Sequence, residues 1–156
     1  MSSIVLIDTS VLLNVLDVPG RNQNRAEVLR LLEEKIDSED HLFIPLATII
    51  ETGNHLAHLQ GSGGLRRTYA DRFVSTVQEA INNQAPWRLM ALPDVDHVLT
   101  WLSDFPDSAM RQVGMGDQSI KKDWEELCRK YSMSRVLVWS VDGDLSGLDR
   151  IPKKKK

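Results

Sequence analysis

The chain contains very little cysteine, with Cys128 the one residue of this type among 156. A single thiol cannot form an internal disulfide framework, and no group of cysteines and histidines has the spacing of a zinc site. The lone thiol suits a reducing compartment, so we expect a cytoplasmic protein. Cys128 itself lies in an apolar helical pattern, which predicts a residue packed in the core.

Long hydrophobic runs are also missing. No stretch approaches the roughly 20 apolar residues that cross a bilayer, and the short apolar run at residues 4–7 has no basic residue before it, as a secretion signal would. We therefore expect a soluble protein with no membrane partner. The densest glycine cluster, at residues 61–64, lacks the Gly-Lys-Ser/Thr of a phosphate-binding loop, so we interpret it as a connector.

No excess of positive charge marks the chain as a nucleic-acid-binding protein, because its formal net charge is −3. Basic residues are nevertheless concentrated at residues 66–72, 121–122 and 153–156, and local potential, rather than net charge, steers a polyanion. Length and composition predict one domain over residues 1–150. The basic tail at residues 151–156 either holds RNA phosphates or is a solvated terminus.

Short apolar runs alternate with helical patterns along the chain. Apolar runs typical of buried strands lie at residues 3–7, 41–44, 87–92 and 134–141, and amphipathic periodicities separate them. This alternation predicts an α/β fold with a central, mostly parallel sheet of four to five strands and helices on both faces.

One of the later helices has a particularly clear apolar pattern. The spacing of Val95, Val98, Leu99 and Leu102 predicts a helix that turns these side chains toward the core. Pro106 is expected to end this helix, because proline cannot donate a backbone hydrogen bond and clashes with the preceding turn.

Four acidic residues lie at the ends of predicted strands or on predicted helices, in apolar surroundings: Asp8, Glu51, Asp117 and Asp142. A buried charge is costly unless it is neutralised, and no lysine or arginine is adjacent to any of the four. If folding brings them together, a divalent cation is the natural partner, and oxygen ligands favour Mg²⁺ or Mn²⁺ over zinc. The pattern predicts metal-dependent hydrolysis of a phosphodiester.

Some of these acids also have a simpler interpretation. Aspartate is a favoured helix N-cap, so capping explains Asp8 or Asp117 when either is taken alone. Capping explains Glu51 poorly, because this residue lies inside a predicted helix behind two isoleucines. A fifth acid, Asp144, is equally well explained as a helper in metal binding or as part of a turn, since Asp-Gly-Asp is ordinary turn chemistry.

Three basic residues are candidates for substrate binding. Arg66 and Arg67 carry guanidinium groups that fit phosphate oxygens, and His55 shares a helical face with Glu51 at the i, i+4 spacing. The alternative for all three is a solvated helix surface.

Taken in order, the acidic motifs resemble those of the PIN-domain family of metal-dependent ribonucleases, particularly the VapC-like toxins of toxin–antitoxin pairs. The resemblance spans residues 4–145. The matching segments are Ile7-Asp8-Thr9-Ser10, Ile50-Glu51, Asp117 at the start of a late helix, and Ser140-Val141-Asp142-Gly143-Asp144-Leu145.

The resemblance implies a three-layer PIN-like fold whose strand ends bind one or two Mg²⁺ or Mn²⁺ ions. The four acids would be the metal ligands and catalytic groups, with Asp144 as a nearby helper, and the hydroxyls of Ser10 and Ser140 would orient the carboxylates. The resemblance also implies an RNA substrate, an antitoxin protein as partner, and a homodimer. For the dimer, the apolar helices at residues 24–60 are the candidate surface.

The sequence therefore predicts a Mg²⁺- or Mn²⁺-dependent endoribonuclease, with a toxin as the implied biological role. The first alternative is a catalytically silent PIN-like module that binds RNA or a protein without cutting. A phosphatase or DNA nuclease that uses the same acids is a second alternative, because the acids determine the chemistry and the surrounding loops select the substrate.

Overall fold

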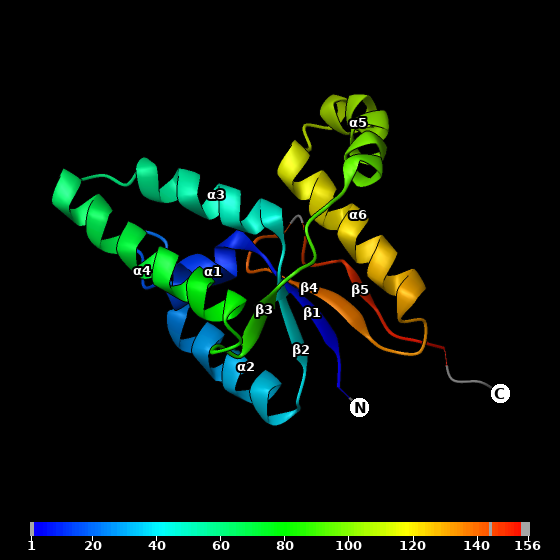
Figure 1. Ribbon diagram of the computed structural model, residues 1–156, viewed down its shortest axis with the longest axis horizontal. Helices are drawn as coiled ribbons and strands as arrows, with labels where there is room; N and C mark the ends of the chain where they lie inside the picture. Colours follow the sequence, from blue (N-terminus) through cyan, green and yellow to red (C-terminus); the bar gives the residue numbers. More distant parts are fainter. Residues whose placement is uncertain (1, 144, 154–156) are drawn as a thin grey trace.

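A five-stranded sheet runs through the centre of the computed structural model, which describes residues 2–143 and 145–153 (Figure 1). The strands lie in the order β3-β2-β1-β4-β5, and every neighbouring pair is parallel except β4 and β5. The predicted α/β fold with a mostly parallel sheet of four to five strands is confirmed. The strands are β1 (Ile4–Ile7), β2 (His41–Ile44), β3 (Trp87–Leu89), β4 (Val136–Trp139) and β5 (Asp149–Arg150).

Helices pack on both faces of this sheet, an arrangement compatible with a three-layer α/β fold. Side chains of α1, α2 and α4 contribute to the hydrophobic core on one face, and α6 covers the other. The helices α3 and α4 run side by side and extend away from the sheet (Figure 1). The helices are α1 (Thr9–Val15), α2 (Arg25–Asp37), α3 (Leu46–Ala57), α4 (Gly63–Ile81), α5 (Val95–Met110) and α6 (Met115–Lys130).

The central strand β1 shows why its sequence is apolar throughout. Val5 and Ile7 point into the core shared with α1 and α2, whereas Ile4 and Leu6 point into the core shared with α6. All four residues are buried, which is what a strand covered on both faces requires.

The two strands that neighbour β1 come from different parts of the chain. The chain continues from β1 to β2 on one side, and β4 returns to pair with β1 on the other side. The backbone N–H of Asp8 donates to the carbonyl oxygen of Trp139 at 3.0 Å, so the ends of β1 and β4 are held together. In open parallel sheets, ligands bind in the crevice outside the carboxyl ends of the strands at such a reversal of strand order.

The prediction that the apolar side chains of α5 point toward the core was wrong, because these side chains are exposed. Val95, Leu99 and Leu102 are 74%, 57% and 52% exposed, and Val98 is exposed as well. Polar groups on one face of α5 contact α6 instead. The Lys122 ammonium pairs with Asp104, and the Gln118 side chain donates to the Trp101 carbonyl at 2.7 Å.

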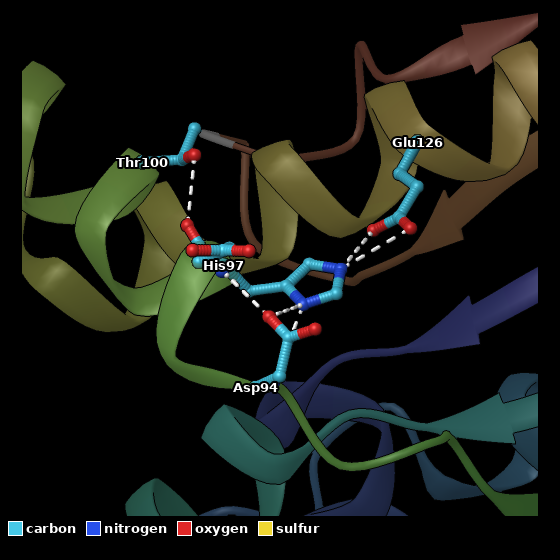
Figure 2. A network of polar contacts seen from close by, with 5 residues as sticks. Asp94, His97, Thr100 and Glu126 are labelled. Carbon is cyan, nitrogen blue, oxygen red and sulfur yellow. Dashed lines mark hydrogen bonds and ion pairs between the residues drawn. The ribbon is translucent and has the colours of Figure 1, made fainter.

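His97 provides the third contact between α5 and α6, and Figure 2 shows its ring between two carboxylates. Its Nε2 atom lies 2.9 Å from Glu126 of α6, and its Nδ1 atom lies 2.6 Å from Asp94, which caps α5. These contacts raise the pKa of His97, mainly through the hydrogen bond with Glu126 and then the one with Asp94. A polar network therefore holds α5 against α6.

The prediction that Pro106 ends this helix was also wrong, because α5 continues through Pro106 to Met110. A proline removes one backbone hydrogen bond and bends the helix, but residues beyond it can still be held by packing. Ser108, two residues later, is buried, and its carbonyl accepts from Val113 N at 2.9 Å.

Candidate functional site

A polar cavity of about 240 Å³ lies at the carboxyl ends of β1 and β4, where the two connections diverge. All four of the acids singled out in the sequence line this cavity, although they come from four separate segments: Asp8, Glu51, Asp117 and Asp142. Folding therefore brings together carboxylates that span most of the chain.

Asp8 lies directly after β1 and is 5% exposed. It occupies the N-cap position of α1, but its side chain makes no capping hydrogen bond. Its Oδ2 atom instead accepts from the hydroxyls of Ser10 and Ser140, each at 2.9 Å. Capping through the side chain thus does not explain this aspartate.

The two serines form a closed hydrogen-bonding arrangement around Asp8. While each hydroxyl donates to the carboxylate, it accepts from a backbone N–H of the segment after β4: Val141 N lies 3.1 Å from Ser10, and Asp142 N lies 3.0 Å from Ser140. Each hydroxyl therefore donates to Asp8 and accepts from the segment after β4. This arrangement fixes the Asp8 carboxylate relative to both strand ends.

Glu51 reaches the cavity from the middle of α3, which Thr48 ties to the end of β1 by donating to the Ile7 carbonyl at 2.7 Å. Burial is the main cause that raises the pKa of Glu51, followed by the negative charges of Asp117 and Asp8. The Thr9 hydroxyl donates to Glu51 at 3.4 Å and opposes this rise. The Glu51 carboxylate is therefore close enough to those of Asp117 and Asp8 to be repelled by both.

Asp117 and Asp142 complete the acidic lining. Asp117 is in the first turn of α6, whose N-cap is Gly114, so it does not occupy the capping position that the simpler interpretation required. Asp142 is exposed, in the loop after β4. The predicted helper Asp144 lies outside the described residues.

The carboxylate oxygens that line the cavity are the kind of ligand that Mg²⁺ and Mn²⁺ prefer, although they do not form a closed cage. Within residues 2–143 and 145–153, no three His, Cys, Asp or Glu side chains converge as a ready-made coordination group. Mg²⁺ commonly binds through one or two carboxylates and keeps several waters, so it does not need a closed cage. A divalent cation would relieve the repulsion by Asp117 and Asp8 that adds to the effect of burial on the pKa of Glu51.

The basic candidates divide into one that lines the cavity and two that do not. His55 lines it from α3. Arg66 instead donates to the carbonyls of Leu59 and Gly61, which closes the turn between α3 and α4. Arg67 is exposed on α4, 3.8 Å from Asp71, and does not line the cavity either.

Sequence reasoning missed the contribution of the loop between α1 and α2. Arg21, Gln23 and Asn24 of this loop line the cavity, together with the buried Asn14 of α1. No spacing in the sequence marks these residues. The sequence feature that could have indicated them is the shortness of the predicted first helix. A helix this short leaves the following loop close to the strand end from which the helix starts.

Comparisons with models of known protein families and with curated proteins give no match to this chain. No helix in the described part of the chain is long and apolar enough to cross a membrane.

Proposed function

We propose that this protein is a Mg²⁺- or Mn²⁺-dependent endoribonuclease with a PIN-like fold. One observation carries the proposal: four carboxylates from four separate segments line one cavity at the reversal of strand order between β1 and β4. Carboxylate clusters of this kind are suited to the hard cations that assist phosphodiester hydrolysis.

The chain's own groups would position the reaction. A bound divalent cation would supply an acidified water and neutralise charge on the phosphate. Ser10 and Ser140 hold the Asp8 carboxylate in one orientation, and the half-buried Glu51 approaches from α3. No side-chain nucleophile is required, because water attacks phosphorus in this reaction.

The resemblance to VapC-like toxins adds a biological role to the proposal, that of the toxin in a toxin–antitoxin pair. It adds an antitoxin protein as partner, RNA as the substrate and a homodimer as the functional form. These three points come from the motifs, and the antitoxin would be identified by co-purification from cells that express the chain with its neighbouring genes.

The nuclease is tested by incubating a mixed pool of structured and single-stranded RNAs with the protein in Mn²⁺, in Mg²⁺ and in EDTA. We expect metal-dependent cleavage by the wild type and a loss of about 100-fold or more in Asp117→Asn, because a ligand or catalytic acid is neutralised. Asp71→Asn is the matched control, because Asp71 is exposed on α4 and does not line the cavity. Equal activity in Asp117→Asn and the wild type would refute the proposal.

A catalytically silent module that binds RNA or protein is the alternative, and metal binding separates the two. A cation at 100 times its dissociation constant stabilises the protein by about 2.7 kcal/mol. The nuclease predicts this stabilisation for the wild type in Mn²⁺ and its loss in Asp8→Asn. A module without a metal site predicts no change in either protein.

A further inference from the structure

Arg21 introduces a positive charge into the acidic cavity. It follows the Pro19-Gly20 turn between α1 and α2 and lines the same cavity as the four acids. Arg21 is exposed, and within residues 2–143 and 145–153 the hydrogen bond seen for it is that of its backbone N–H rather than of its guanidinium.

Neighbouring arginines have different roles. Arg25 donates to the carbonyls of Asn14 and Val15 at 2.8 and 2.7 Å, and Arg72 donates to the Leu16 carbonyl at 2.8 Å. These guanidinium groups satisfy the carbonyl groups at the end of α1 and so hold the scaffold. Arg21 is the arginine near α1 that faces the cavity without such a task.

The loop that carries Arg21 is held in place by hydrogen bonds. The backbone N–H of Arg21 donates to the Val18 carbonyl at 3.0 Å, and the Asn22 side chain donates to Asp17 at 2.9 Å. Asn14 accepts from the Asn24 backbone N–H at 3.0 Å and donates to the Ser10 carbonyl at 2.8 Å. The position of the loop backbone is therefore coupled to the segment that holds Asp8, and this fixes the point from which the exposed Arg21 side chain extends.

An anionic substrate needs such a group here. A phosphodiester that approaches four carboxylates is repelled, and divalent cations offset only part of that repulsion. A guanidinium offers several N–H donors in a fork that matches two oxygens of one phosphate. His55 adds a nitrogen donor from α3, and Arg21 is near enough to contribute to lowering the pKa of His55, second to burial.

We propose that Arg21, together with His55 from the same cavity lining, binds the non-bridging oxygens of the RNA phosphate that enters the acidic cavity. This inference rests on the proposed function and specifies it, because it assigns the substrate-binding side of the cavity to the loop between α1 and α2. The loop residues would then position the phosphate while the carboxylates act on it.

The test compares Arg21→Ala, Arg21→Lys and the matched control Arg67→Ala, which removes the same charge from the exposed surface of α4. The first measurement is kcat/KM for Mn²⁺-dependent RNA cleavage. The second is the binding of a fluorescently labelled single-stranded RNA across a salt series. For the binding measurement each variant also carries Asp117→Asn, so that the RNA is not cleaved. Mn²⁺ binding is followed in parallel by thermal stabilisation, because a change in metal affinity alone would indicate a different role for Arg21.

We expect Arg21→Ala to lower kcat/KM by about 10- to 100-fold, the loss typical of one charge-assisted hydrogen-bonding group. The slope of log binding constant against log salt is negative and should become less steep by about 0.7, as for the loss of one phosphate contact on a single strand. Arg21→Lys should recover part of the loss, since it keeps the charge but not the fork. Arg67→Ala should stay close to the wild type, and Mn²⁺ binding should be retained in all three variants.

The possible failures are distinguishable. If the wild type cleaves RNA and Arg21→Ala matches Arg67→Ala in both assays, the inference is wrong while the nuclease stands. If the wild type binds RNA without cutting it and Arg21→Ala weakens that binding, the nuclease is wrong while the phosphate contact stands. If the wild type neither cuts nor binds RNA, both are overturned.

Discussion

The carboxylate of Glu51 occupies the space that a side chain at Gly116 would need. An ideal Cβ built on Gly116 would lie 1.7 Å from Glu51 Oε1 and 2.7 Å from its Cδ. Because Gly116 has no side chain, the Glu51 carboxylate from α3 can reach the cavity beside Asp117. The local packing of two helices thus controls the position of one acid.

Substituting Gly116→Ala should separate stability from activity. The methyl group displaces the end of a flexible glutamate side chain, so the fold can adjust, and alanine favours a helix over glycine by up to about 1 kcal/mol. We expect an unchanged or slightly raised Tm together with weaker Mn²⁺ binding and slower RNA cleavage. Gly114→Ala is the control, because its Cβ would meet no atom within 4 Å. Similar activity in both variants would contradict the role given to this contact.

Removing the Ser10 hydroxyl should loosen Asp8. Ser10→Ala removes a donor to the carboxylate and leaves the Val141 N–H without its acceptor, which costs about 1 to 3 kcal/mol of stability. We expect a lower urea midpoint and reduced cleavage. The double variant with Ser140→Ala should deviate from additivity, since both hydroxyls bond the same oxygen.

Ser103→Ala provides the comparison for this pair, because its exposed hydroxyl bonds only a carbonyl of its own helix at 3.2 Å. A midpoint for Ser10→Ala as close to the wild type as that of Ser103→Ala would show that the hydrogen bonds around Asp8 contribute little.

The contact between α5 and α6 should weaken as pH rises. The pKa of His97 is raised above its usual 6.5 by Glu126 and Asp94, so the charged form stabilises the fold below about 6.5. This contribution is lost as pH rises through the folded-state pKa. Hydrogen exchange, corrected for intrinsic rates, should show α5 amides losing protection at high pH while β1 stays protected. His97→Gln should remove the pH dependence, and equal pH dependence in this variant would argue against the histidine.

Asp123 should destabilise the protein above neutral pH. Burial, followed by the charge of Glu126, raises its pKa from 3.8 to about 7, against the opposing effect of His97. The protonated form is favoured in the folded state, so its stabilisation is complete below about pH 4 and is lost through about pH 7. Asp123→Asn should therefore gain about 1 kcal/mol or more at alkaline pH and little in acid. Thermal melts at both pH values test this, and exposed Asp107→Asn should show no such difference.

The exposed apolar face of α5 is a second candidate surface for the proposed homodimer, besides the helices at residues 24–60. Val95, Leu99 and Leu102 form a patch on a helix whose polar side is already packed, and such patches mark protein interfaces. The double substitution Leu99→Asp and Leu102→Asp should convert a dimer to a folded monomer in sedimentation velocity. A dimer that survives this change would place the interface elsewhere.

The parts of the fold that the sequence predicted are those decided by local pattern. The apolar run at residues 4–7 indicates a central strand because burial on both faces leaves no polar position, and Asp8 follows from it. The orientation of α5 could not be predicted in this way. Its apolar stripe favours inward packing, but Lys122, Gln118 and Glu126, which lie on a later helix, bind its polar side instead.

The candidate site shows the same division. Each acid was visible from its own strand end or helix, whereas the loop with Arg21 lies at the cavity through contacts such as those of Asn14 with Asn24 and Arg25. The sequence separation of these contacts is short, but they depend on side-chain geometry that composition and periodicity do not encode.

The hydrogen bond between Ser140 and Asp8 joins residues 132 positions apart. A ribosome makes the chain from its first residue, so Asp8, Glu51 and Asp117 all emerge before the segment that completes their surroundings. The cavity can be assembled only when β4 inserts beside β1, after residues 136–139 have been synthesised. An unfinished chain would therefore carry its acids on an incomplete edge, and whatever reaction the cavity performs would begin only after translation has passed β4.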